Sequence, residues 1–222
     1  MLLAALASAA VAAACPANAA SGLGLPARTG QLLTVEAKAA RTTYASLQRW
    51  QRGADGCWFR VGRAVPARVG WNGIRANRRE GDGTTPAGTF PIGRTMYGTA
   101  PDPGVRFAYR RLRCGDWWDE DPRSRTYNTF VHVPCGTRPP FRTTTPGMWE
   151  QPRPYPHLAV VEFNMDPVVP GRGSGIFLHA ETGGPTNGCV SLRRGDLVTV
   201  LRWLRPARAP AISIVTSATL RP

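Results

Sequence analysis

The sequence predicts a mostly β protein with one short C-terminal helix, and three observations support this. Short apolar and aromatic runs recur along most of the chain, bounded by Gly, Pro, Asn and Asp, which is typical of strands joined by turns. A run near the C-terminus repeats instead at helical spacing. The length of 222 residues suits one well-buried domain with short appendages.

The predicted elements follow an irregular stretch at 20–30, which we interpret as a linker. Apolar runs typical of strands begin at Leu32, Thr43, Cys57, Ala67, Phe130, Ala159, Gly175, Cys189 and Ala211. The helix is indicated by Leu197, Val198, Val200, Leu201 and Leu204, with Asp196 in the cap or first turn and Pro206 ending it. Because this helix directly follows the Cys189 run, we expect it to pack on the sheet behind that cysteine.

The segment 109–150 is too rich in Pro and Gly for regular elements, and its length is typical of a variable lid or substrate loop. It gathers four acidic residues around two tryptophans: Asp116, Asp119, Glu120 and Asp121 around Trp117 and Trp118. The patch has two interpretations. It contacts a cationic or sugar-containing ligand, or it is a disulfide-stapled surface loop with solvated charges.

The N-terminus predicts export. Residues 1–19 are apolar and alanine-rich, and they end in Ala17-Asn18-Ala19, the small-x-small pattern of a signal-peptidase site. We therefore interpret them as a signal peptide. A lipoprotein anchored through Cys15, a membrane anchor and a segment without a targeting role are the alternatives.

The formal net charge is +14, and Lys38 is the only lysine, so arginine carries nearly all of the positive charge. A protein this basic is attracted to polyanions. Export argues against nucleic acid as the partner and favours anionic polymers of the cell envelope. We expect a monomer.

A histidine and a cysteine lie ten positions apart in HAETGGPTNGCVSL, residues 179–192. Alternation places Phe177 and His179 on one face of a strand, and Cys189 and Ser191 on one face of the next. If the two strands are neighbours, the imidazole and the thiol can meet, because facing Cβ atoms lie about 4.5 to 5.5 Å apart.

This pair suits acyl transfer through a thioester. A nearby histidine raises the thiolate fraction of Cys189, and the backbone amides of Gly188 and Cys189 can hold an oxyanion. On spacing alone, an ordinary structural loop remains the alternative. A zinc site is disfavoured, because His132 and His157 show no ligand spacing with this pair.

Two segments resemble the L,D-transpeptidase (YkuD-like) family. Its motif has a histidine after a strand and then Ser/Thr-His-Gly-Cys, which Thr186, Gly188 and Cys189 match, with His179 upstream. Residues 79–93, REGDGTTPAGTFPIG, resemble the family's Gly-Asp-Gly-x-Thr-Pro-x-Gly-x-Phe segment. Without the family, this segment is a turn-rich connection in which Glu80 and Asp82 are solvated.

The resemblance implies a catalytic domain of sandwich-like or barrel-like mixed sheets over residues 31–218. It implies that Cys189 attacks the third-residue carbonyl of a peptidoglycan stem tetrapeptide and releases the terminal D-alanine, while His179 keeps the thiol ionised. An amine of a second stem then forms a cross-link, whereas water makes the enzyme a carboxypeptidase or hydrolase. No metal or organic cofactor is required.

The sequence departs from the family motif at two positions. Asn187 stands where the motif usually has histidine, which leaves His179 as the candidate base. Ser191 stands where arginine or asparagine is frequent, so a substrate carboxylate would be bound by Arg193 or Arg194. The full set of predicted substrate-binding residues is Thr186, Asn187, Ser191, Arg193, Trp117 and Trp118. The group that orients the histidine is Glu181 or a backbone carbonyl.

Two other protein classes remain as rivals. A secreted peptidase of the NlpC/P60 type uses cysteine and histidine, but its cysteine precedes its histidine. A non-catalytic wall-binding module would need only the positive charge and the tryptophans.

The remaining cysteines predict one disulfide. If Cys15 leaves with the signal peptide and Cys189 is catalytic, an oxidising compartment favours one pair among the other three. We predict Cys114 with Cys135, because both border the same irregular segment, at a gain of roughly 3 kcal/mol. Cys57 is then a buried free thiol.

Overall fold

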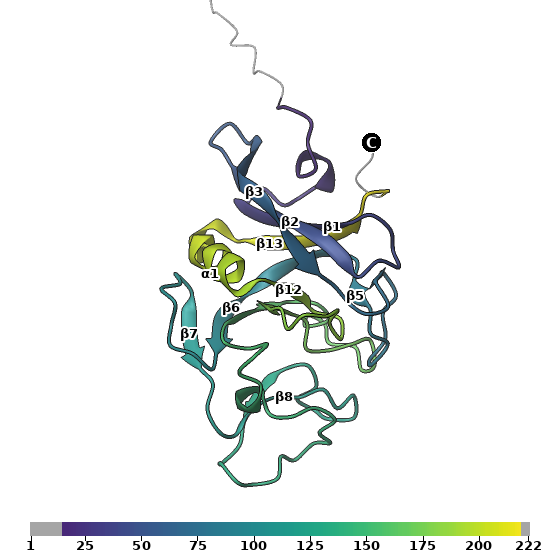
Figure 1. Cartoon of the computed structure of the whole chain (residues 1–222), viewed down its shortest axis with the longest axis vertical. Helices are drawn as coiled ribbons and strands as arrows, with labels where there is room; N and C mark the ends of the chain where they lie inside the picture. Colours follow the sequence, from purple (N-terminus) through teal and green to yellow (C-terminus); the bar gives the residue numbers. More distant parts are fainter. Residues whose placement is uncertain (1–14, 219–222) are drawn as a thin grey trace, which may run out of the picture.

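The structure is a computed structural model that describes residues 15–218. Most of the predicted signal peptide therefore lies outside the described residues. Within 15–218, no helix has the length and apolar character needed to cross a membrane. Figure 1 shows a layered β core above a loop-rich lower part, which holds β8.

The core is a nine-stranded sheet that closes on itself. Around it run β1 (Gln31–Ala37), β2 (Tyr44–Arg52), β3 (Trp58–Arg68), β6 (Gly88–Gly98), β10 (Leu158–Val161), β11 (Phe177–Ala180), β12 (Val190–Leu192) and β13 (Ala211–Thr216). Closure occurs because β10 pairs with β11 on one side and with β6 on the other. The ninth strand, β7 (Ala108–Arg111), pairs with β6 outside this ring.

Every strand of the ring sends alternate apolar side chains into one buried cluster, as period-two patterning requires. Helix α1 (Arg194–Trp203) adds Leu197, Val200 and Leu201 to the same cluster. Asp196 lies in its first turn, and the helix ends before Pro206. The predicted fold class is therefore confirmed: mostly β, mixed and barrel-like, with a short helix packed behind the cysteine strand.

Most ladders in the ring are antiparallel, but β11–β12 and β1–β13 are parallel. The predicted strand runs all contain strands, whereas β6 was not predicted. Its sequence, GTFPIGRTMYG, carries a proline and three glycines, one of them internal and two terminal, which break the usual strand pattern. Two short ladders complete the structure: β4 (Ile74–Arg75) with β5 (Thr85–Pro86), and β8 (Asp116–Trp118) with β9 (Phe130–His132).

The N-terminal part of the described chain packs against the barrel. Ala20 is buried with Leu32, Trp50 and Trp58, next to the short 3-10 helix η1 (Ser21–Leu23). The 20–30 stretch, interpreted above as a linker, thus contributes side chains to a buried cluster.

Two disulfides are present, Cys114–Cys135 as predicted and Cys15–Cys57. The prediction that Cys57 is a free thiol is therefore wrong, because it assumed that Cys15 leaves with the signal. A sulfur held in a disulfide cannot also carry a lipid, which argues against the Cys15 lipoprotein. Cleavage after Ala19 remains a prediction, and a chain cut there would lack the Cys15–Cys57 bond.

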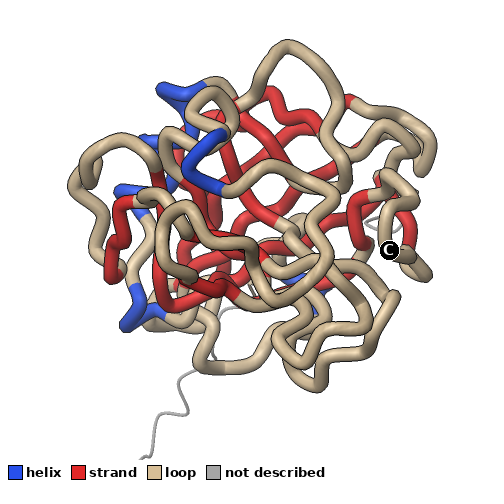
Figure 2. The backbone as a smooth tube through the Cα atoms, turned by 90° about the horizontal axis from the view of Figure 1, so that it is seen from below, coloured by secondary structure: helices blue, strands red, loops and turns tan. Residues whose placement is uncertain are grey.

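The 109–150 segment is irregular but closely bonded. It contains β8, β9 and the 3-10 helix η2 (Met148–Glu150), and Figure 2 shows the large share of loop in the molecule. Asp116 and Asp119 are fully buried. The interpretation that these charges are solvated is therefore wrong, because both carboxylates serve as hydrogen-bond acceptors inside the segment.

Candidate active site

The candidate nucleophile lies where β11 and β12 run side by side. In this parallel pair Leu178 is opposite Val190, and His179 is opposite Ser191. The Phe177 amide donates to Cys189 Sγ at 3.4 Å, and the thiol donates to the Gly175 carbonyl at 3.3 Å. The strands are neighbours as predicted, but parallel pairing places the cysteine beside Phe177 and not directly opposite His179.

The loop before Cys189 is held by two threonine hydroxyls. Thr186 Oγ1 and Thr85 Oγ1 both donate to the Cys189 carbonyl, at 2.6 and 3.2 Å. Gly188 has φ +111, a left-handed value that favours glycine, and its amide donates to Thr186 Oγ1 at 3.2 Å. Thr186 thus positions the cysteine, and the Gly188 amide is already engaged in the resting site.

His179 lies on the same strand face as Phe177, and Tyr155 packs against both rings. The ring centroids of Tyr155 and His179 are 5.6 Å apart in an edge-to-face contact, and those of Tyr155 and Phe177 are 5.7 Å apart. His179 Nδ1 is 2.8 Å from the Ala180 carbonyl. Since a carbonyl only accepts, Nδ1 carries the proton and Nε2 of the neutral ring is unprotonated. A backbone carbonyl, and not Glu181, is therefore the group that orients the histidine.

Thiol and imidazole are both uncharged in the resting site. Burial lowers the pKa of His179 to about 4, against a smaller opposing effect of the Ala180 carbonyl. Burial raises the pKa of Cys189 to about 12, although the Phe177 amide and the Arg78 charge act in the other direction. The expectation that His179 keeps the thiol ionised is thus not met, because desolvation outweighs the nearby donors.

Cys189 opens into a pocket of about 510 Å³ between the barrel and the 109–150 segment. Its wall includes Asn187 and Trp118, two of the predicted substrate-binding residues. Trp118 is fixed there by an edge-to-face contact with Phe177 and by a hydrogen bond from its Nε1 to Asn128 Oδ1, 3.0 Å long. This volume is ordinary for a ligand site.

The other predicted substrate-binding residues do not line this pocket. Trp117 packs against Trp149 and Phe141. Ser191 is 1% exposed, and Arg193 lies at the start of α1 with its Nε 3.8 Å from a Glu181 oxygen. Thr186 is turned inward, as described above.

Several residues that the sequence analysis did not assign to the site lie in this wall. They include Arg78, Glu80, Glu120 and Tyr155. Glu80 accepts hydrogen bonds from the hydroxyls of Tyr127 and Ser174, the latter at 2.7 Å. Glu80 is thus a bonded wall residue rather than a solvated turn residue. The only sequence signal for Arg78 and Glu80 is that they precede or begin the matched segment at 79–93.

Asp82 is also bonded rather than solvated. Its carboxylate accepts from the Arg79 amide at 2.8 Å, from the Thr84 amide at 2.9 Å and from the Thr84 hydroxyl at 2.6 Å. These bonds fix the Gly-Asp-Gly turn, whose glycines Gly81 and Gly83 both have positive φ. The turn brings Arg78 and Glu80 to the pocket.

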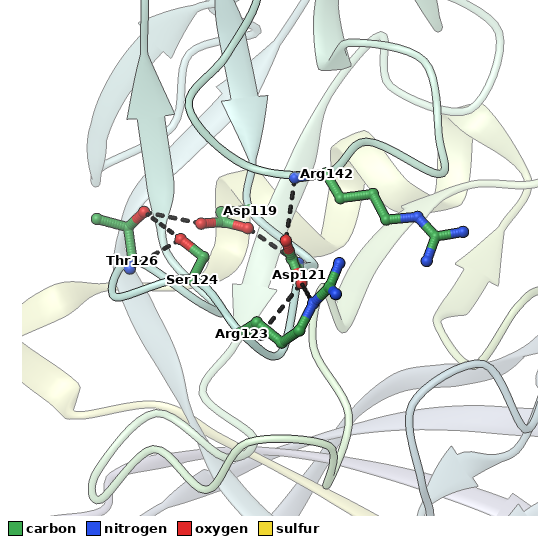
Figure 3. Close-up of polar contacts among 6 residues, drawn as sticks. All are labelled: Asp119, Asp121, Arg123, Ser124, Thr126 and Arg142. Carbon is green, nitrogen blue, oxygen red and sulfur yellow. Dashed lines mark hydrogen bonds and ion pairs between the residues drawn. The ribbon is translucent and has the colours of Figure 1, made fainter.

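The opposite wall is organised by acidic side chains, shown in Figure 3. Asp119 accepts from Thr126 Oγ1 at 2.7 Å and from the Asp121 amide at 2.9 Å. Asp121 in turn accepts from the amides of Arg123 and Arg142, at 3.1 and 3.0 Å. These contacts hold Glu120 between two fixed aspartates, and burial raises the pKa of Glu120 to about 7.

A family model for the L,D-transpeptidase catalytic domain (YkuD) matches residues 32–213. Among solved structures, the chain is similar to L,D-transpeptidase 1 of Mycobacterium tuberculosis, with 14% sequence identity and a TM-score of 0.32. That match covers 83% of this chain and 62% of the other, so the chain spans less than two thirds of that protein. No curated protein matches the sequence. Since the family model covers most of the chain, including both quoted segments, this protein belongs to the L,D-transpeptidase catalytic domain family.

Proposed function

We propose that this protein is an exported cysteine acyltransferase that acts on peptidoglycan stem peptides. The observation that carries the proposal is that Cys189 lines a pocket of about 510 Å³ and lies in the segment that matches the family motif. Export is supported by the Cys114–Cys135 disulfide, because disulfides are typical of proteins from oxidising compartments and cleavage of the signal peptide leaves this one in place.

Burial raises the pKa of the Cys189 thiol, so the thiol loses its proton during the reaction and not before it. The unprotonated Nε2 of His179 takes the Cys189 proton as sulfur bonds to the carbonyl carbon of the third stem residue. The bond to the terminal D-alanine then breaks, and the imidazolium gives its proton to the leaving amine. The Ala180 carbonyl stabilises the imidazolium, since it already accepts from Nδ1.

The thioester is resolved by a second nucleophile. An acceptor amine that attacks the thioester carbonyl forms a 3-3 cross-link and returns the proton to Cys189. Water in the same position yields a free tripeptide. In both cases the Cys189 amide supports the oxyanion, whereas the Gly188 amide must first leave Thr186 Oγ1.

Mass spectrometry of a covalent adduct tests the nucleophile. A carbapenem is expected to acylate the purified protein once, at Cys189, and to leave the Cys189→Ala variant unmodified. Folded wild-type protein without an adduct would contradict the enzyme proposal and favour a non-catalytic wall-binding protein. Incubation with a disaccharide tetrapeptide then separates the outcomes, because cross-linked dimers mark a transpeptidase and free tripeptide marks a carboxypeptidase.

A further inference from the structure

Arg78 is a buried guanidinium near the candidate nucleophile, and it has no ion-pair partner among residues 15–218. The residue is 3% exposed, yet its Nε and Nη1 make no hydrogen bond with any of residues 15–218. Buried arginines are normally paired, because moving an unpaired charge out of water is strongly unfavourable. An unpaired buried arginine is typical of a site where the guanidinium binds a ligand.

The packing around Arg78 directs it at the reaction centre. A Cβ built on Gly188 would lie 2.5 Å from Arg78 Nη1, so the guanidinium rests against the residue that precedes Cys189. A Cβ on Gly173 would lie 2.6 Å from Arg78 Nε. Both neighbours are glycines with positive φ, and any larger side chain would displace the guanidinium. Arg78 also lines the pocket into which Cys189 opens.

The carboxylates near Arg78 do not neutralise it by contact. Glu80 is bonded to two hydroxyls, and Glu120 accepts from Thr145 Oγ1 at 3.0 Å. Neither forms an ion pair with Arg78 within 4.0 Å. The remaining contact is a marginal one, with the guanidinium carbon 5.9 Å from the ring centroid of Phe163. Arg78 thus lines the pocket with its charge unpaired by any of residues 15–218.

We infer that Arg78 binds a carboxylate of the donor peptide, the one on the residue that leaves, immediately beyond the scissile carbonyl. This inference rests on the proposed function. That carboxylate is the anion nearest to a carbonyl bound at Cys189, and a guanidinium fork binds carboxylates with two parallel hydrogen bonds. Arg193, predicted above for this task, lies at the start of α1 outside the pocket. Arg78 therefore makes the site selective for donors with a free C-terminal carboxylate.

Paired donors test the inference. The values of kcat/KM are compared for a stem tetrapeptide ending in D-alanine and for the same peptide ending in D-alaninamide. We expect the wild type to prefer the free acid by roughly 10- to 100-fold. Arg78→Met is expected to lower kcat/KM for the free acid alone, which brings the acid-to-amide ratio near one. Arg78→Lys is expected to give a ratio between those of Arg78→Met and the wild type. An equal loss for both donors, or an unchanged ratio, overturns the inference.

A matched control separates the effect of Arg78 on the acid-to-amide ratio from the effect of positive charge near the pocket in general. Arg142 lines the same pocket but is exposed, and Arg142→Met is expected to leave the acid-to-amide ratio unchanged. Arg78→Met should also be at least as stable as the wild type, because it removes a buried unpaired charge. A marked fall in the melting temperature would point to a structural role and contradict the inference.

Alkylation provides a readout that does not depend on peptidoglycan. Cys189 is the free cysteine of the described chain, so the rates of its reaction with iodoacetate and iodoacetamide report anion binding beside the sulfur. The iodoacetate-to-iodoacetamide ratio is expected to fall in Arg78→Met and to stay constant in Arg142→Met. If the iodoacetate-to-iodoacetamide ratio falls in Arg78→Met while the wild type turns over no stem peptide, Arg78 binds an anion but the proposed function is wrong. If peptides are turned over but neither ratio changes, the Arg78 inference fails.

Discussion

The two walls of the Cys189 pocket are built by different kinds of contact. On the barrel side, His179 and Cys189 lie on or beside short strands whose neighbours are fixed by backbone pairing. On the other side, the 109–150 segment has little regular structure, and its shape depends on buried carboxylates such as Asp116 and Asp119. A barrel-side mutation should therefore affect chemistry first, whereas a mutation in the segment should affect stability and substrate fit first.

The largest loss of activity is expected from mutations on the barrel side of the pocket. Cys189→Ala is expected to abolish turnover, and His179→Ala to lower kcat by roughly 10²- to 10⁴-fold, the usual contribution of a general base. Both variants should keep the wild-type melting temperature within a few degrees. Turnover of a stem peptide by His179→Ala at near wild-type rate would show that another group acts as the base.

The next largest effect should come from Asp116 in the 109–150 segment. Its carboxylate accepts from Arg110 Nη2 at 3.0 Å and from the Arg113 amide at 3.0 Å, and it lies 2.7 Å from His132 Nδ1. Asp116→Ala leaves these groups without their acceptor and is expected to lower the free energy of unfolding by about 1 to 3 kcal/mol, because the Arg110 and His132 side chains are partly exposed and can be solvated. Urea denaturation measures this loss. A loss below about 1 kcal/mol would contradict the view that carboxylates hold the segment together.

A smaller, pH-dependent effect is expected at Glu120. Burial raises its pKa from 4.5 to about 7, so between these values the folded protein binds more protons than the unfolded chain. The free energy of unfolding therefore falls as pH rises through this window. Glu120→Gln removes this dependence and should match the wild type below pH 4.5. Above pH 7 it should be more stable by at most roughly 3 kcal/mol, measured by urea denaturation at several pH values.

For Glu120, the sign of the difference is decisive. If Glu120→Gln is less stable than the wild type above pH 7, the carboxylate is ionised and paired in the folded protein. A charged contact of Glu120 would then help to hold the 109–150 segment together, and the pKa of Glu120 would have to be lowered rather than raised.

The smallest effect is expected at Glu181. Its carboxylate lies 3.8 Å from the Nε of the exposed Arg193, and exposed pairs contribute about 0 to 1 kcal/mol. Since the Ala180 carbonyl orients His179, Glu181→Gln should leave kcat/KM within roughly twofold of the wild type. A large fall in kcat with unchanged stability would make Glu181 an orienting group after all.

The sequence predicted the barrel side better than the 109–150 segment, for a physical reason. Strand alternation is local, so the face shared by Phe177 and His179, the Cys189 run and the α1 helix could all be inferred from nearby residues. The order and direction of strand pairing are not local. The parallel pairing of β11 with β12, which sets Ser191 opposite His179, therefore had no sequence signal.

The parts that were missed depend on residues distant in sequence. Arg78, Glu120 and Cys189 share one pocket although they are more than 40 positions apart, and no spacing rule connects them. The solvated reading of Asp116 and Asp119 was wrong because their donors come from the fold of the segment. The free thiol predicted at Cys57 was wrong because its partner, Cys15, was assigned to the signal peptide.

The closure of the sheet through β10 and β6 has a further consequence, for hydrogen exchange. Strands β11 and β12 each have a hydrogen-bonded neighbour on both sides, so their amides are not at a free edge. Their exchange with solvent should require opening of the whole barrel, whereas the two-stranded β8–β9 ladder can open alone. Deuterium uptake by the peptides around Cys189 then reports global unfolding, and uptake by the peptides around Trp118 reports local opening of the opposite wall.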